Sequence, residues 1–506
     1  MKQPALACLM LLTGATHALD AKNPFLADSP WPISHHDSQA SDTSSVPGPT
    51  SAVQLGAPSF VFTGFTNVTQ AISPRYPDGS YVYWGSNSSN VYKLATRNGK
   101  LVKLADMSKP GSPISIKNPT NGAYTLVDLE NIFYTVKGTR ILAYTDKVRG
   151  NPASPIMLLR ELSLSSKVNL KADDSVVGLN LTWDGKLVFA TKYGIVGVVD
   201  RAFTTVSSLD LNKNNIKEED QEQVSNSIST DASGGIYVVT SKKMHRVQWT
   251  GAAVTQNPAS GAWTADYNFG NGDTVNGGLG AGSGSTPTVM GEGSQQFIVI
   301  TDGAKVNNLV LFWKDAIPAD WKNPIAPGKD IRIAAEIPVN FGNPNRKSTY
   351  SEQSVVVNGY GAVVVSNDYR NLNFLPSGTG NPLIDNITTG ISAFFSGLPL
   401  FQPWGVQKFE WNPQTRKLSS AWVNNDVSCP NAIPTASSTA GMFYCVGARD
   451  RQWTIEGLDW DNGQSRFRKY VGLLPRFNSF YAATQIAADG GIIYGSIDGV
   501  VYLPRR

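Results

Sequence analysis

The sequence repeats one short pattern eight times between residues 81 and 503. Each repeat has an apolar run, a short turn and a second apolar run, which is typical of a β-hairpin. None of the repeats has the spacing of an amphipathic helix. The eight pairs of runs are 81–85 with 91–94, 132–134 with 141–144, 187–190 with 195–199, 236–239 with 244–249, 297–300 with 309–312, 362–365 with 406–411, 442–445 with 455–460, and 492–494 with 500–503.

This recurrence is typical of a β-propeller, in which four-stranded sheets form blades around a central channel. We therefore predict an all-β chain with eight blades, or with seven if two hairpins share one sheet. A large sandwich or a β-solenoid is the alternative. The last unit has only two clear strands, and a ring must cover its open edges, so we expect residues 60–63 to complete the final blade. The single propeller domain then covers 59–506, with an insertion at 371–403.

The first 18 residues have the features of a secretory signal peptide: Lys2, an apolar run over 5–12, and small residues at the cleavage site. The apolar run is too short to span a bilayer, and no later stretch is long enough. We therefore expect a periplasmic or secreted protein without a transmembrane segment. Residues 19–58 are rich in Ser, Pro and Asp and are expected to form an extended strap.

Three cysteines are present, and Cys8 leaves with the signal peptide. Cys429 and Cys445 remain, and an oxidising compartment favours a disulfide between them. The formal net charge is only +4, and 16% of the residues are charged. Because nucleic-acid-binding domains carry a much larger basic surface, we expect no nucleic-acid partner.

Several segments together resemble a family of exported, quinoprotein-like propeller proteins, related in fold to dehydrogenases that use pyrroloquinoline quinone (PQQ). The resemblance supports the propeller but implies no settled activity. Gln353 and Asp368 depart from the family pattern, since Asn is usual at the first position and Asn or a similar polar residue at the second. The segments are 31–37, 226–240, 284–290 with 300–302, 352–354 with 366–369, 458–463, and 477–481 with 490–494.

The quinoprotein dehydrogenases place a calcium site and a disulfide between adjacent cysteines beside the cofactor, and some bind haem at Cys-x-x-Cys-His. Here the two mature cysteines are 16 positions apart and no Cys-x-x-Cys occurs. The resemblance therefore does not extend to these features, and we expect neither haem nor PQQ.

Only four histidines occur, and His17 leaves with the signal peptide, so a multi-histidine zinc site is poorly supported. His35 and His36, with Asp37, are candidates for one catalytic base if the strap enters the channel. The alternative is a polar strap segment that forms hydrogen bonds across blade edges. We expect His245, in a strand, to be structural.

Polar residues flank the predicted strands of neighbouring units, where a propeller brings side chains together around its axis. Asn226, Thr286, Glu352 and Asn478 precede strands, whereas Asp302, Asn367 and Asp368 follow them. If both sets lie at one channel mouth, their oxygens suit Ca²⁺, with Glu352, Asp302, Asn226 and Asn367 as ligands. The alternative is that such residues cap turns. Residues 180–185 are similar to a strand-entry motif of calcium-dependent propeller lactonases.

The insertion is apolar around Phe394 and Phe395, and a loop of this length is often a lid; packing against its own blade is the alternative. We expect these two residues, with Asn226, Asn367, Asn478 and Tyr481, to bind a small, apolar organic ligand. Glu352, Asp302 and Asp368 are the catalytic candidates of a metal-assisted hydrolase or lyase. The alternative function is a non-enzymatic binding or assembly scaffold with a partner protein in the cell envelope.

Overall fold

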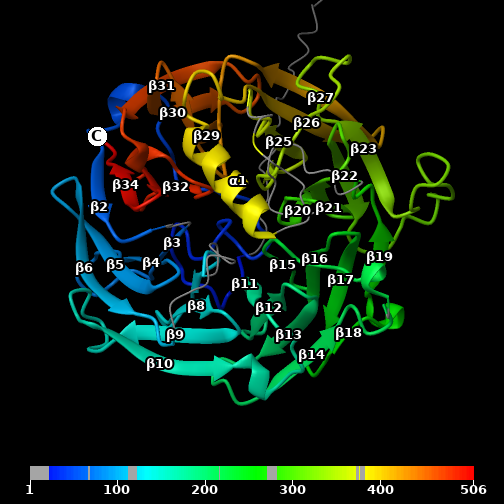
Figure 1. Ribbon diagram of the computed structural model, residues 1–506, viewed down its shortest axis with the longest axis horizontal. Coiled ribbons are helices and arrows are strands. Elements are labelled where there is room, and N and C mark those ends of the chain that lie inside the picture. The colour runs from blue at the N-terminus through cyan, green and yellow to red at the C-terminus, as the bar shows by residue number, and fades with distance from the viewer. Residues whose placement is uncertain are drawn as a thin grey trace, which may run out of the picture.

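The computed structural model describes residues 22–65, 69–111, 122–215, 217–270, 282–371, 375 and 382–506. The predicted signal peptide lies outside these residues. Within them, eight sheets form a ring around a central axis (Figure 1). The prediction of an eight-bladed β-propeller is therefore confirmed.

The blades follow one another along the chain, and within each blade the strands are ordered from the axis outward. The first four blades are β3 (Gln70–Ile72), β4 (Tyr83–Ser86), β5 (Asn90–Arg97) and β6 (Lys100–Ser108); β7 (Leu126–Val127), β8 (Phe133–Lys137), β9 (Arg140–Asp146) and β10 (Ile156–Ser163); β11 (Val176–Leu181), β12 (Leu187–Thr191), β13 (Ile195–Val199) and β14 (Val206–Asp210); and β15 (Ser229–Thr230), β16 (Gly235–Val239) and β17 (Lys243–Trp249), with β18 (Val254–Thr255) and β19 (Trp263–Asp266) both paired to β17.

The last four blades are β20 (Thr288–Glu292), β21 (Gln295–Thr301), β22 (Asn308–Trp313) and β23 (Ile333–Pro338); β24 (Val356–Asn358), β25 (Gly361–Val365), β26 (Val406–Asn412) and β27 (Lys417–Asn424); β28 (Thr435–Ser437), β29 (Met442–Arg449), β30 (Gln452–Asp459) and β31 (Ser465–Gly472); and β32 (Thr484–Ile486), β33 (Ile492–Gly495), β34 (Gly499–Leu503) and β2 (Ser59–Phe62). Short 3-10 turns η1 to η5 cover Ala52–Gln54, Leu164–Ser166, Glu218–Asp220, Pro258–Ser260 and Pro475–Phe477.

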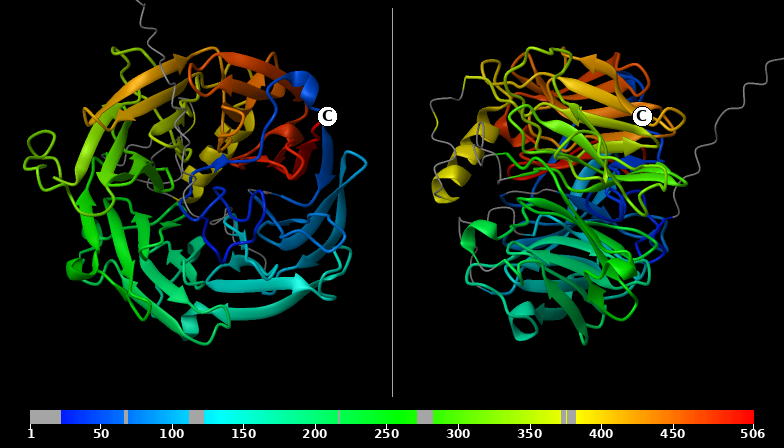
Figure 2. Two further views of the ribbon diagram at one scale, coloured as in Figure 1. Left: turned by 180° about the vertical axis from the view of Figure 1, so that it is seen from behind. Right: turned by 90° about the vertical axis from the view of Figure 1, so that its right-hand side faces the viewer.

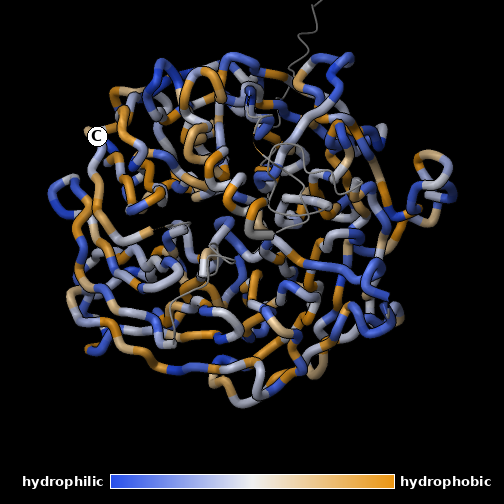
Figure 3. Tube along the Cα trace, viewed as in Figure 1, coloured by the Kyte–Doolittle hydropathy of each residue, from blue (hydrophilic) through white to orange (hydrophobic). Residues whose placement is uncertain are grey.

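Each of the eight predicted hairpins is the second and third strand of one blade. These strands pack against neighbouring blades on both faces, and every residue of β12 and β13 is buried. Burial on both faces explains why the sequences of these strands are continuous apolar runs and do not alternate between apolar and polar residues. Figure 3 shows the apolar stretches within the blades and the hydrophilic turns at the rim.

The N-terminal strand β2 closes the ring by pairing antiparallel with β34, the last strand of the chain. Its register places Ser59 opposite Tyr502 and Phe62 opposite Gly499. Near the axis, the amide of Gln485 accepts from the backbone N–H of Gln70 at 2.9 Å and donates to the Gln70 carbonyl at 2.8 Å. The predicted closure by an N-terminal strand is confirmed.

The strap runs around the inner strands and enters the centre of the ring (Figure 2, left). It contains one two-residue strand, β1 (Thr43–Ser44), which pairs parallel with β28. Its backbone carbonyls accept hydrogen bonds from the inner strands of blades 1, 2 and 4 to 7, and its residue Gly56 donates to Pro504 at 2.9 Å beyond the end of β34 in blade 8. In blade 3 the link is a side chain, since the Asn180 amide donates to the Ser38 carbonyl at 3.0 Å. The strap therefore links all eight blades.

The insertion forms a helix, α1 (Pro382–Phe395), which the β pattern did not predict. It lies across one face of the ring, on the side away from the strap (Figures 1 and 2). Its small residues Thr388, Ser392 and Ala393 are buried, whereas large apolar residues on the helix and just after it are exposed: Ile384, Ile387, Ile391, Phe394, Phe395, Leu398 and Leu400. In the described part of the chain no helix has the length and hydropathy needed to cross a membrane.

Candidate functional site

In each blade the innermost strand is antiparallel to the second strand. The loop that precedes the innermost strand therefore lies at the same end of the channel as the loop that follows the second strand. We call this end the α1 mouth, since α1 lies in the loop that follows β25, the second strand of its blade. The turns between first and second strands form the opposite end, the strap mouth. Both predicted sets of polar residues therefore lie at the α1 mouth.

A turn of the strap places His35 and Asp42 at the axis. Four of its residues, His35, His36, Ala40 and Asp42, have positive φ angles between 54° and 73°. Non-glycine residues rarely adopt this conformation, and it often marks a functional constraint. The strap therefore reaches the channel, which was the condition for a role of these histidines in the site. His35 pairs with Asp42, whereas His36 pairs with Asp37.

His35 joins a threonine hydroxyl to a buried carboxylate. Its Nδ1 is 2.8 Å from Asp42 Oδ2, and its Nε2 is 3.2 Å from Thr286 Oγ1. The ring stacks on Tyr124 at 5.8 Å between centroids. Burial raises the pKa of Asp42, although the His35 ring opposes this effect. The other Asp42 oxygen, Oδ1, is buried and has no hydrogen-bond partner among the described residues.

Glu352 is buried beside three tyrosines. Burial raises the pKa values of Tyr124, Tyr369 and Tyr481, and the charge of Glu352 raises them further. The pKa of Tyr124 rises to about 12. These phenols therefore stay protonated near neutral pH and are hydrogen-bond donors. We call the set His35, Asp42, Tyr124, Thr286, Glu352, Tyr369 and Tyr481 the axial cluster.

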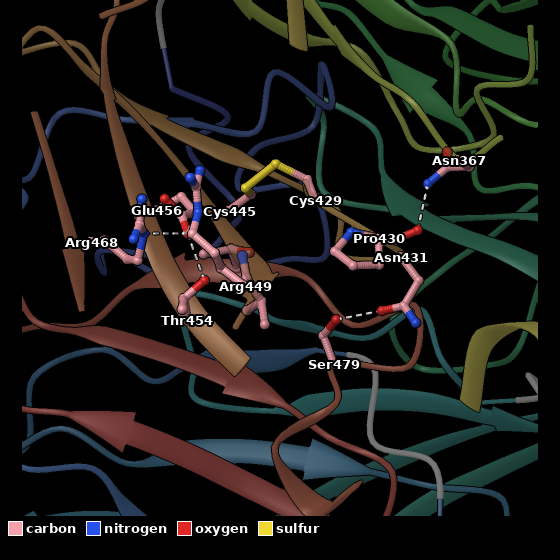
Figure 4. Close-up of a disulfide and its surroundings, with 12 residues drawn as sticks. Asn367, Cys429, Pro430, Asn431, Cys445, Arg449, Thr454, Glu456, Arg468 and Ser479 are labelled. Carbon is pink, nitrogen blue, oxygen red and sulfur yellow. Dashed lines mark hydrogen bonds and ion pairs between the residues drawn. A yellow bond between two sulfur atoms is a disulfide. The ribbon is translucent and has the colours of Figure 1, made fainter. Parts of the chain in front are cut away.

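Asn367 positions the backbone at Glu352. Its Oδ1 accepts from the backbone N–H of Glu352 at 2.8 Å, and its Nδ2 donates to the Pro430 carbonyl at 3.0 Å (Figure 4). Pro430 follows Cys429, which forms the predicted disulfide with Cys445. That prediction is confirmed. The disulfide therefore anchors the loop that fixes Asn367.

Two asparagines attach α1 to the ring. The Nδ2 groups of Asn431 and Asn478 donate to the Ala393 carbonyl at 3.0 and 2.9 Å. The last carbonyls of a helix lack partners within it, so these amides cap the C-terminus of α1. Asn478 therefore contacts the backbone of the predicted lid. Phe394 and Phe395 are each 38% exposed.

The other predicted site residues form hydrogen bonds or ion pairs with protein groups. Asp302 accepts from the backbone and side-chain N–H groups of Asn308 at 2.7 and 2.8 Å. Asn226 donates to the Ser283 carbonyl at 3.0 Å, and Asp368 pairs with Arg346 at 3.2 Å. No group of three or more His, Cys, Asp or Glu residues suited to a metal occurs in the described ranges. The calcium site stays a prediction.

Asp302 gives the fold a pH dependence. Burial raises its pKa to about 6, so the folded protein favours the neutral carboxyl. This contribution to stability is complete below about pH 4 and is lost as the pH rises through 6, by about 3 kcal/mol in total. Asp302→Asn should flatten the unfolding free energy over this range, measured by urea unfolding between pH 4 and 7. Asp461→Asn, on an exposed turn, is the control, and an equal slope in both variants would contradict the assignment.

Over 495 residues the chain is 37% identical to a protein of Archaeoglobus fulgidus named only as an uncharacterized protein; the match covers 95% of this chain and 90% of the relative. The chain belongs to the family of this protein. No family model matches it.

Solved structures with the same fold include quinoprotein dehydrogenases. The quinohemoprotein alcohol dehydrogenase of Comamonas testosteroni matches with a TM-score of 0.56 and 13% identity, over 96% of this chain and 80% of that one. The quinohemoprotein alcohol dehydrogenase ADHIIG of Pseudomonas putida HK5 matches with a TM-score of 0.54 and 12% identity, over 95% of this chain and 80% of that one. A europium-containing methanol dehydrogenase matches with a TM-score of 0.54 and 8% identity, over 95% of this chain and 98% of that one. At these identities the similarity shows the fold alone.

The axial cluster does not fit PQQ. That cofactor is a polycarboxylate, and a buried anion requires cationic or hydrogen-bonding partners. The cluster has phenol donors, but it also holds two carboxyl groups, those of Asp42 and Glu352, and it contains no lysine or arginine to offset the charge of further carboxylates. We therefore derive no reaction step through a quinone.

Proposed function

We propose that the chain is an exported propeller that binds a small, apolar organic ligand at the α1 mouth and acts on it as a hydrolase or lyase. The observation that carries this proposal is the axial cluster itself: a buried carboxylate, three protonated tyrosines and a Thr–His–Asp hydrogen-bond chain at one point of the channel. Titratable groups gathered and buried in this way are characteristic of catalytic sites.

The residues have complementary roles in this proposal. Glu352 takes a proton from water or from the ligand, and a tyrosine O–H stabilises the oxyanion that develops. His35, oriented by Asp42, is the second base and acts through the Thr286 hydroxyl.

Glu352→Gln tests this assignment because it keeps the size of the side chain and removes its charge. We expect hydrolysis of a small aryl lactone, dihydrocoumarin, to fall about 100-fold, the contribution of one acid–base group. The thermal midpoint should change little. Glu218→Gln, on the exposed η3 turn, is the control. Equal turnover by the wild-type and Glu352→Gln proteins would refute the role of Glu352.

The predicted Ca²⁺ is tested with the same two proteins. If Glu352, Asp302, Asn226 and Asn367 bind Ca²⁺, EDTA should lower the melting temperature of the wild-type protein and leave that of Glu352→Gln unchanged. Identical responses of the two proteins to EDTA would remove calcium from the proposal.

The exposed apolar side of α1 favours a second function, an assembly scaffold. Its polar residues face the ring and its large apolar residues face solvent, and such patches commonly mark interaction sites. The double variant Ile387→Asp with Ile391→Asp distinguishes the two functions. If the chain is a scaffold, this variant should lose its envelope protein in a pull-down. If the chain is the proposed enzyme, the variant should keep lactone hydrolysis, which depends on Glu352.

A further inference from the structure

The strap mouth contains an open groove that the axial cluster does not use. Two adjoining cavities of about 430 and 340 Å³ share His36, Asp37, Lys22, Asn23 and Ser45 as lining residues. The larger cavity is otherwise lined mainly by apolar side chains, including Leu26, Val46 and Tyr81. This strap-face groove has the size and apolar lining typical of a small-molecule site.

His36 is the titratable ring that lines both cavities. Its Nδ1 is 3.2 Å from Asp37 Oδ2, and its side chain is 16% exposed. The ring packs edge-on against buried Trp31, with 5.0 Å between centroids. Nε2 has no hydrogen-bond partner among the described residues. By contrast, His35 and His245 are almost fully buried.

Hydrogen bonds fix the Asp37 carboxylate beside the imidazole of His36. Its Oδ1 accepts from the backbone N–H groups of Gln39 at 2.9 Å and Ser41 at 3.2 Å, and its Oδ2 accepts from the Ser41 hydroxyl. Burial alone would raise the Asp37 pKa, but these hydrogen bonds and the His36 ring lower it. The carboxylate is placed at Nδ1, so in the neutral imidazole it holds the ring proton on Nδ1 and leaves the lone pair on Nε2.

We propose that the strap-face groove is a separate hydrolytic site in which His36 is the general base and Asp37 is its positioning residue. The Ser41 hydroxyl is engaged with Asp37 and so is not aligned with Nε2. Water is therefore the nucleophile.

The reaction is ester hydrolysis. Nε2 takes a proton from water as the water oxygen bonds to the acyl carbon. The bond from that carbon to the alkoxy oxygen then breaks, and Nε2 returns the proton to this oxygen, which gives an acid and an alcohol. Esters suit direct attack by water, because an alkoxide leaves more readily than an amine anion. The apolar lining selects a short, uncharged acyl chain, and Lys22 is a cation that lines both cavities.

Hydrolysis of p-nitrophenyl butyrate by the full mature chain tests this site. His36→Gln should lower kcat/KM about 100-fold. Asp37→Asn should lower kcat more than it changes KM, since Asp37 acts on the reaction through the His36 ring. Thr250→Ala, on an exposed turn away from the groove, is the control. Wild-type rates in either groove variant, or no hydrolysis by the wild-type protein, would overturn the proposal.

A second measurement does not depend on turnover. Diethyl pyrocarbonate should modify His36, as located by peptide mass mapping, because the rings of His35 and His245 are buried. This modification should abolish ester hydrolysis. Absence of label on residue 36, or full activity of the labelled protein, would show that Nε2 is not available and would overturn the assignment.

Discussion

A chain that lacks residues 19–62 is expected to lose its cooperative unfolding transition. The deletion removes the closing strand β2 and the strap, with the fully buried side chains of Trp31, Ile33 and Leu55. Each such side chain contributes about 1.5–3 kcal/mol. Together with the lost hydrogen bonds, the deficit is comparable to the total stability of about 5–15 kcal/mol typical of a domain. Differential scanning calorimetry of the truncated chain and of the chain that retains residues 19–62 checks this result.

A milder pair of variants keeps this prediction measurable if the truncated chain does not fold. Trp31→Ala should cost about 3–5 kcal/mol, as expected for a fully buried large side chain. Val53→Ala lies in the same strap but is 78% exposed, so it should have almost no effect. Equal melting temperatures for these two variants would show that the strap does not support the ring.

Loss of the disulfide should have the second largest effect. Replacing Cys429 and Cys445 by serine removes a link across a short loop and should lower the unfolding free energy by about 2–4 kcal/mol. Because this loop carries Asn431, which caps α1, we also expect faster proteolysis within α1. Chemical unfolding under non-reducing conditions and limited proteolysis measure the two effects.

Reduction provides the matched control for this pair. Dithiothreitol should bring the wild-type protein to the stability of the double serine variant and should leave that variant unchanged. Mass mapping under non-reducing conditions that finds both thiols free in the wild-type protein would contradict the prediction.

The sequence was sufficient to predict the eight blades and their closure, because buried β-hairpins leave an apolar pattern that depends only on local spacing. It did not predict α1, since the surrounding pattern is β and the helix turns its large apolar residues outward. A helix is usually recognised by an apolar face directed toward a core, and here that face is exposed.

The sequence placed several polar residues at one channel mouth, whereas their functional roles stay predictions. The position of Glu352 before an inner strand indicated the channel mouth correctly, because propeller topology alone determines that placement. Asp42 was missed, and His35 was linked to Asp37, because the partner of each histidine depends on the left-handed turn of the strap. The positive φ angles that create this turn occur at His, Ala and Asp residues, where no glycine marks them. Asp302 lies at this mouth and accepts hydrogen bonds from Asn308, whereas its roles as a Ca²⁺ ligand and a catalytic residue stay predictions.

The pairing of β2 with β34 joins two segments that are 443 positions apart, as the hydrogen bond from Ser59 to Tyr502 shows. No ring can close until the last strand has been synthesised, so the N-terminal segment waits without its partners while the blades form. Contacts so distant in sequence make folding slow. If the predicted signal peptide directs export of the unfolded chain, this order of events keeps the fold incomplete until the last strand has emerged.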